Sequence, residues 1–369
     1  MKRALCIVLD SVGCGHAPDA AAYGDEGANT LGHLFERSPD LALPHLASLG
    51  LYELLGIPTP IPLHPGASWA RLTEFSHGKD TTSGHWELMG CQMGEPFATF
   101  TRFPADFIAE LESRAGVGFI GNYPASGTEI LVQLGEEHLR SGKPILYTSA
   151  DSVLQIAAHE EVFGLERLWE ICKSARSLLD ERGIRIGRVI ARPFIGHSAS
   201  EFKRTGNRHD YSLLPGETLL NRLQNSGIQT LGVGKIADIF ADSGITKSYP
   251  SQSNNEGMAL IDQLWQSKLN QPHFIFANLV DFDSLYGHRR DPKGYARCLM
   301  DFDTWLGGFL GKISPTDFVI LTADHGNDPY HPGTDHTREQ VPTMALGKTI
   351  ADGPFSDVAK WLEEYFSLG

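Results

Sequence analysis

Short apolar runs rich in β-branched residues alternate along this chain with stretches of helical periodicity, and this alternation restricts the possible folds more than any other feature. Buried strands separated by helices are typical of an α/β protein with a mostly parallel sheet between layers of helices. The strands that we expect are Ala4–Leu9, Ile145–Thr148, Val189–Ala191, Thr230–Val233, Phe274–Val280, Phe318–Thr322 and Thr343–Leu346. The helices that we expect are Thr30–Glu36, Phe107–Arg114, Thr128–Arg140, Leu165–Arg182, Thr218–Gln224, Met258–Lys268, Tyr295–Leu310 and Phe355–Phe366.

Polar residues follow nearly every expected strand at the point where the strand ends. Ligands of open α/β sheets bind beyond the carboxyl ends of the strands. One polar residue at a strand end needs no functional explanation, but the repetition favours a site at this edge. The residues concerned are Asp10, Ser149, Asp151, Arg192, Lys235, Asp281, Asp283, Asp324 and His325.

The chain has 369 residues, which is the length of about two domains at roughly 150 residues each. Weak boundaries occur near Gly94–Pro96 and near Leu214–Gly216, and the segment between them has strands and helices of its own. We therefore expect a discontinuous core formed by residues 1–95 and 216–369, with residues 96–215 inserted as a second α/β domain, a cap.

The net charge limits the kinds of partner that we expect, and the cysteine pattern indicates the redox state of the compartment. The net charge of −14 does not suggest a nucleic-acid surface, and nothing in the sequence implies a protein partner. The five cysteines are scattered without a CxxC motif, which favours a reducing compartment. No apolar run approaches the ~18 residues of a membrane span, so we expect a cytoplasmic protein that does not bind membranes.

Carboxylates and imidazoles gather in three places that could form a metal site. The first is Asp10, the second is the stretch from Asp281 to His288, and the third runs from Asp324 to His336. Each cluster alone is weak evidence, because such residues are common on protein surfaces. Together they provide more ligands than one ion needs, which favours two divalent ions such as Mn²⁺ or Zn²⁺ for chemistry at phosphorus.

A hydroxyl-rich loop lies at 78–87 and precedes a helix that we expect to begin near His85. A hydroxyl here could coordinate a metal, lose its proton and attack phosphorus. Alternatively, Thr82 or Ser83 could act only as the N-cap of the helix. The loop by itself favours the capping interpretation.

Longer motifs in collinear order identify the family that the chain resembles. They include LDSVGCGHAPDA at 9–20, GKDTTSGHWELMG at 78–90, YTSADSVLQIAAHEE at 147–161, GRVIARPFIG at 187–196, NLVDFDSLYGHRRDP at 278–292 and LTADHGNDPYHPGTDHTREQVP at 321–342. With these motifs the chain resembles the phosphopentomutases, a family of the alkaline phosphatase superfamily. One departure is a shorter stretch between the last strand and the last helix, where oligomer contacts could differ.

The resemblance implies an alkaline-phosphatase-like core with an inserted cap, two Mn²⁺ ions and a phosphorylated Thr81. By motif position, one ion would be surrounded by Asp10, Thr81, Asp324 and His325, and the other would be held by Asp283, His288 and His336. The residues that match the sugar-phosphate pocket are Ser149, Asp151, Val153, Arg192, Arg208, His209 and Lys235.

The activity that the resemblance implies is the interconversion of ribose 1-phosphate, or its 2-deoxy form, with the 5-phosphate in nucleoside catabolism and salvage. The phosphothreonine enzyme would form a 1,5-bisphosphate intermediate, with a sugar 1,6- or 1,5-bisphosphate as activator and pentose phosphates as the only partners. A metal-dependent phosphohydrolase and a different mutase on the same core remain alternatives.

Overall fold

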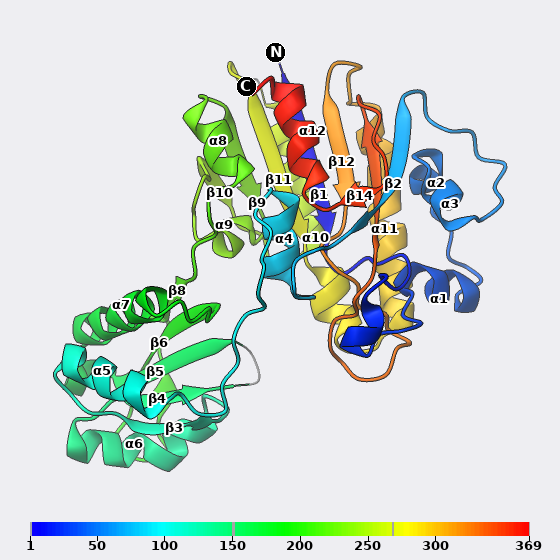
Figure 1. The fold of residues 1–369 in the computed structure, drawn as a ribbon. Coiled ribbons are helices and arrows are strands. Elements are labelled where there is room, and N and C mark those ends of the chain that lie inside the picture. The colour runs from blue at the N-terminus through cyan, green and yellow to red at the C-terminus, as the bar shows by residue number, and fades with distance from the viewer. Residues whose placement is uncertain (1, 150–151, 268, 369) are drawn as a thin grey trace. The chain divides into compact units, whose positions relative to one another are not determined.

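The computed structural model describes residues 2–149, 152–267 and 269–368 (Figure 1). Contacts between Cα atoms divide the chain into two compact units. The first, here called the core unit, comprises residues 1–95 and 215–369, and the second, the inserted unit, comprises residues 96–214.

The core unit contains a mixed sheet in the order β10-β9-β11-β1-β12-β13-β2-β14. Its strands are β1 (Arg3–Leu9), β2 (Ala67–Thr73), β9 (Gln229–Val233), β10 (Lys247–Tyr249), β11 (His273–Leu279), β12 (Phe318–Thr322), β13 (Val341–Leu346) and β14 (Gly353–Pro354). Pairing is parallel from β10 to β12, and β13 is antiparallel to both of its neighbours. Every residue of β11 and β12 is buried, because helices cover both faces of the sheet.

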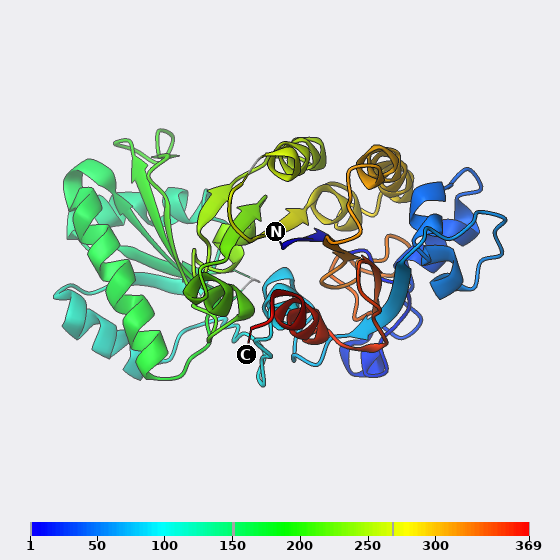
Figure 2. The same cartoon turned by 90° about the horizontal axis from the view of Figure 1, so that it is seen from above.

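Helices α10 and α11 cover one face of this sheet, and α4 and α12 cover the other (Figure 2). The helices of the core unit are α1 (Thr30–Arg37), α2 (Pro44–Ser48), α3 (Leu51–Leu55), α4 (Thr81–Leu88), α8 (Leu219–Asn225), α9 (Ile236–Ile239), α10 (Asn254–Gln266), α11 (Pro292–Leu310) and α12 (Asp357–Phe366). A short 3₁₀ helix, η1 (Ala20–Tyr23), and a π-helical turn, η3 (Phe282–Gly287), complete it. None of the helices in the described part of the chain has both the length and the apolarity that a membrane span needs.

The inserted unit has a sheet of its own, in the order β3-β4-β5-β6-β7, with β8 also paired to β6. Its elements are α5 (Ala105–Ala115), β3 (Ile120–Pro124), α6 (Glu129–Ser141), β4 (Ile145–Thr148), β5 (Val153–His159), η2 (Glu160–Gly164), α7 (Leu165–Glu181), β6 (Arg188–Ile195), β7 (Lys203–Arg204) and β8 (His209–Ser212). One apolar cluster joins α5 and α7 to the sheet, and a second joins α6 to it.

The predicted α/β class is confirmed, and each predicted strand overlaps an observed one. Two details of the prediction were wrong. The strand predicted to end at Ala191 continues to Ile195, so Arg192 lies within β6 and not at its end. The helix expected to begin near His85 begins at Thr81, because Asp80 and not Thr82 or Ser83 provides the cap.

A first prediction concerns the independence of the inserted unit. Expressed alone, residues 96–214 are expected to unfold in one cooperative thermal transition, because two buried apolar clusters lie entirely within this unit. Far-ultraviolet circular dichroism during heating checks this. A gradual, non-sigmoidal loss of signal would show that the unit depends on the rest of the chain.

Candidate active site

Three neighbouring parallel strands bring the predicted metal ligands to one edge of the core sheet. β1 lies between β11 and β12. Asp10 directly follows β1, and Asp283 lies in η3 shortly after β11. Asp324 is the second residue after the end of β12. Because these strands are parallel, their carboxyl ends meet at the same edge.

The first group at this edge consists of Asp10, Asp324 and His325, all at most 3% exposed. One ligand atom from each lies within 4.8 Å of the others. The Nε2 atom of His325 is 3.3 Å from Oδ1 of Asp10 and 3.4 Å from Oδ2 of Asp324. Among the described residues, neither of these two carboxylate oxygens has a hydrogen-bond partner. Two buried carboxylates whose oxygens lack a hydrogen bond and face only imidazoles are costly unless a cation, either a protonated imidazole or a metal ion, neutralises them.

A strained residue holds this group in place. Ser11 has a φ of 74°, a region that residues with a side chain seldom adopt. Its amide donates to Oδ1 of Asp324 over 3.1 Å, and its carbonyl accepts from the Tyr295 hydroxyl over 2.9 Å. The turn after β1 therefore fixes the carboxylate of Asp324 directly beside Asp10, the residue that precedes Ser11.

The second group consists of Asp283, His288 and His336. Nε2 of His288 is 3.1 Å from Oδ2 of Asp283, and Nε2 of His336 is 3.4 Å from Oδ1 of the same carboxylate. The two Nε2 atoms are 3.1 Å apart. His325 also stacks on His336, with 3.9 Å between ring centroids, so the two groups are continuous.

Backbone carbonyls select the tautomer of all three imidazoles. Nδ1 donates to Thr334 O in His288 (2.7 Å), to Gly326 O in His325 (3.0 Å) and to Lys79 O in His336 (2.8 Å). The Nε2 atom of each ring then faces the carboxylates, and its lone pair is free for a cation when the ring is neutral, which is the arrangement of metal-binding histidines. Carboxylate oxygens and imidazole nitrogens together suit Mn²⁺ or Zn²⁺.

Electrostatics at this edge reflect an excess of negative charge. Burial and the neighbouring Asp324 raise the pKa of Asp10. Burial also opposes a charge on His325, yet Asp324 and Asp10 outweigh it and hold the pKa of His325 well above its ordinary value. The negative charge at this edge therefore favours bound protons on Asp10 and His325. A divalent cation would neutralise the same negative charge.

Thr81 is the first residue of α4 and reaches the first group. Its Oγ1 atom is 3.2 Å from Nε2 of His325. The Asp80 carboxylate caps the helix by accepting from the amides of Thr82 and Ser83. Gly84 allows the close approach, because a Cβ atom there would lie 2.1 Å from the carbonyl oxygen of Asp324.

Sequence reasoning missed several residues that orient these ligands. Asn278 donates to Oδ2 of Asp10 over 2.9 Å, and Asn327 donates to Oδ1 of Asp283 over 2.7 Å. His85 lies with Nδ1 3.0 Å from Oδ2 of Asp324. A polar asparagine within the apolar strand that ends at Leu279 was the available signal for Asn278.

The residues predicted to bind the sugar phosphate lie mainly in the inserted unit. Ser149, Val153, Arg192, Arg208 and His209 belong to this unit, on β4–β6, β8 and the segments next to them. Lys235 follows β9 in the core unit, and Asp151 lies outside the described residues.

Several positive charges lie close together in the inserted unit. Burial and the charges of Arg208 and Arg204 lower the pKa of Arg192. Nε of Arg192 donates to Gln155 over 3.0 Å, and Arg208 pairs with Asp210. Asp210 offsets part of this positive charge, and a further anion would offset the rest.

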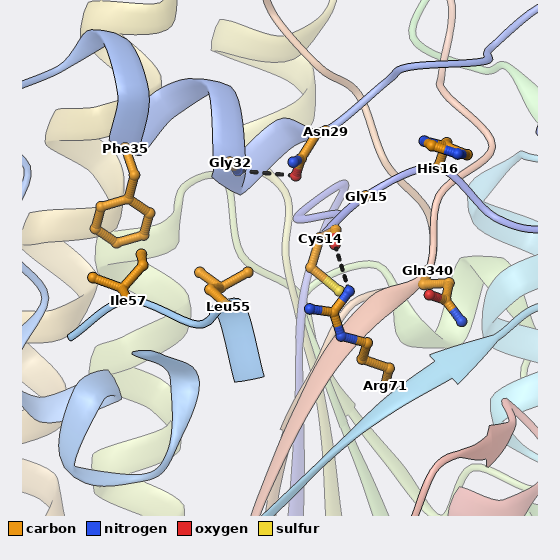
Figure 3. A pocket seen from close by; sticks show the side chains of 10 residues that line it. All are labelled: Cys14, Gly15, His16, Asn29, Gly32, Phe35, Leu55, Ile57, Arg71 and Gln340. Atoms are coloured by element: carbon orange, nitrogen blue, oxygen red, sulfur yellow. Dashed lines mark hydrogen bonds between the residues drawn. The ribbon is translucent and has the colours of Figure 1, made fainter. Parts of the chain in front are cut away.

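A cavity of about 420 Å³ in the core unit is separate from these groups (Figure 3). Cys14, Phe35, Arg71 and Gln340 are among the residues that line it, and none of the predicted site residues does. Arg71 donates to the carbonyl of Cys14, so this guanidinium supports the wall of the cavity. The cavity does not contribute to the site described here.

Comparisons with known proteins agree with this geometry. A family model described as the metalloenzyme superfamily matches residues 2–366. A phosphopentomutase of Symbiobacterium thermophilum is 52% identical, with 96% of this chain and 90% of the relative covered. Phosphopentomutases of Syntrophotalea carbinolica and Levilactobacillus brevis are 50% and 46% identical, with all of this chain and 95% and 96% of the relatives covered.

A second prediction tests the metal ligands. Asp283→Asn and His336→Ala should each weaken Mn²⁺ binding at least about 10-fold, because each change removes one of few donor atoms. Titration with Mn²⁺ and elemental analysis measure this. Asp281→Asn is the matched control, since Asp281 accepts from the amide of Asn254 and is not part of either group. Native metal occupancy in both ligand variants would mean that the second group is not a metal site.

Proposed function

The chain belongs to the phosphopentomutase family of the metalloenzyme superfamily, and from this premise we propose that it transfers a phosphoryl group between C1 and C5 of ribose or 2-deoxyribose. The observation that carries the proposal is the hydroxyl of Thr81, 3.2 Å from His325 in a buried cluster of carboxylates and imidazoles. The hydroxyl that we propose as the nucleophile thus lies beside groups suited to binding divalent cations.

Two Mn²⁺ ions are proposed as the resident metals. The unpaired oxygens of Asp10 and Asp324 fit a cation that is shared with His325 and Thr81. Asp283, His288 and His336 would hold the second ion. When bound, such ions lower the pKa of a coordinated hydroxyl and neutralise charge on phosphoryl oxygens.

Thr81 would carry the phosphoryl group between the two positions of the sugar. In the phosphorylated enzyme, a sugar hydroxyl attacks phosphorus, the bond between phosphorus and Oγ1 of Thr81 breaks, and the hydroxyl proton is released. The product is a 1,5-bisphosphate. After reorientation, Oγ1 of Thr81 loses its proton and attacks the other phosphorus, the bond between that phosphorus and the sugar oxygen breaks, and this oxygen takes up a proton as the monophosphate leaves. A sugar 1,6- or 1,5-bisphosphate would phosphorylate Thr81 at the start.

The sugar phosphate would be recognised mainly by the inserted unit. The proposed contacts are Ser149, Asp151, Val153, Arg192, Arg208 and His209, with Lys235 from the core unit. The cluster of Arg192, Arg204 and Arg208 supports this assignment, because guanidinium groups bind phosphate through paired hydrogen bonds. A cytoplasmic role in the salvage of nucleosides, with pentose phosphates as the only partners, belongs to the same proposal.

A third prediction tests the nucleophile. Thr81→Ala should reduce isomerisation of ribose 1-phosphate at least about a thousandfold, because the group that carries phosphate is removed. Thr82→Ala is the control, since that residue contributes only its backbone amide to the cap. Phosphopeptide mapping after treatment with a sugar bisphosphate should find label on Thr81. Label on Thr82 or Ser83 would refute the assignment.

A fourth prediction tests recognition by the inserted unit. Arg192→Ala should weaken apparent affinity for ribose 5-phosphate by about 2–3 kcal/mol, or ~30–150-fold, through lost charge-assisted hydrogen bonds. Arg192→Lys should restore only part of the loss, because an ammonium lacks the planar fork.

The control for this change is Arg188→Ala, on the same strand but exposed. Affinity and release of free phosphate are measured together in each variant. If Arg192→Ala keeps wild-type affinity and a wild-type ratio of isomerisation to hydrolysis, Arg192 does not bind the substrate.

A further inference from the structure

Arg338 is a buried cation two residues beyond the metal-ligand candidate His336. It is 2% exposed and one of the largest fully buried side chains among the described residues. Its guanidinium donates to Oε2 of Glu74 over 2.7 Å and to Oδ2 of Asp19 over 2.9 Å. It also donates to the carbonyl oxygens of Glu74 and Gly78. Burial opposes the charge, yet Asp19 and Glu74 outweigh burial and raise the pKa of Arg338.

These contacts join the segment that follows His336 to the loop that precedes α4. Glu74 and Gly78 lie in the loop between the end of β2 and the start of α4, and Thr81 is the first residue of α4. The other oxygen of Glu74 accepts from the Ser83 hydroxyl over 2.8 Å, which extends the connection into α4 itself. The guanidinium therefore contacts the loop at two points and the helix through one carboxylate.

A second connection lies beside the first. The backbone amide of Arg338 donates to Oδ2 of Asp25 over 2.9 Å, and the same oxygen accepts from the Lys79 ammonium over 3.0 Å. The carbonyl of Lys79 in turn accepts from Nδ1 of His336. The position of this loop thus decides where the imidazole of His336 points as well as where Thr81 lies.

We propose that Arg338 is a positioning residue that fixes the loop of residues 74–80, and through it sets the separation between the Thr81 hydroxyl and the metal ligands. This inference rests on the proposed role of Thr81. Arginine suits the task because its planar group satisfies acceptors in several directions at once, whereas a lysine ammonium would reach only some of them. Small displacements of a reacting group lower the rate of the chemical step far more than they lower affinity.

The test compares Arg338→Lys with the wild-type holoenzyme. The kcat for isomerisation should fall about 10- to 100-fold while KM for ribose 5-phosphate stays within about 3-fold, because the proposed sugar contacts are not on this loop. The rate at which a sugar bisphosphate phosphorylates Thr81 should fall by the same factor. Ser83→Ala removes the hydroxyl that donates to Oε1 of Glu74 and to the carbonyl oxygen of Asp80, two residues of this loop, and should lower both rates about 3- to 10-fold. If Arg338→Lys does not fold, Ser83→Ala still tests whether the contacts of this loop with α4 set the rate.

The matched control is Arg176→Lys. Arg176 is a buried arginine on α7 of the inserted unit, 7% exposed, that bonds to the Ile186 carbonyl and to Asp180. This variant should unfold at a lower temperature but keep wild-type kcat and wild-type phosphorylation of Thr81. It separates the loss of a buried guanidinium in general from the loss of the one that positions the loop.

Two results distinguish this inference from the function on which it rests. If the wild-type enzyme never becomes phosphorylated on Thr81, the proposed function fails. If the wild-type enzyme is phosphorylated there, but folded Arg338→Lys and Ser83→Ala react at the wild-type rate, Arg338 has only a structural role. An equal loss of kcat in Arg176→Lys would also overturn the inference.

Discussion

Two buried carboxylates at the carboxyl edge of the core sheet impose the strongest constraint on this protein. Asp10 and Asp324 each keep an oxygen without a hydrogen bond, in a site from which water is largely excluded. Removing carboxylates from water costs several kcal/mol per group unless they are paired with cations. Much of the surrounding structure keeps them together in spite of this cost. The strained Ser11 holds Asp324, Asn278 holds Asp10, and the absence of a side chain at Gly84 allows α4 to lie against Asp324.

The same constraint explains why the imidazoles are arranged as they are. A neutral histidine that donates its Nδ1–H to a carbonyl oxygen has a free lone pair on Nε2. Three histidines donate in this way around the carboxylates of the two groups. Without a cation, the facing Nε2 atoms of His288 and His336 would repel each other unless a proton is shared between them. The core unit therefore carries the carboxylates and imidazoles that we propose for chemistry at phosphorus. The guanidinium groups proposed to recognise the sugar phosphate belong to the inserted unit.

Much of the core was predictable because buried parallel strands are continuous apolar runs, and the polar residues that follow them stand out. Asp10, Asp324 and His325 were found in this way. Strand β5 was missed, since Gln155 and two alanines interrupt its β-branched residues. Arg192 was placed at a strand end because Arg192 and Pro193 interrupt an apolar run that nevertheless continues as β6. The start of α4 was misplaced because several hydroxyl and carboxylate side chains in one loop can each cap a helix. Arg338 could not have been singled out, since its contacts with Asp19 and Glu74 join residues hundreds of positions apart.

The two groups at the edge of the core sheet are proposed to hold two divalent cations beside Thr81. Anomalous diffraction from crystals grown with Mn²⁺ tests it most directly, because the signal locates the metal independently of any assumption about ligands. We expect two anomalous peaks, one contacting Asp10, Asp324 and His325 and the other contacting Asp283, His288 and His336. A single peak, or peaks away from these residues, in crystals of active enzyme would contradict it.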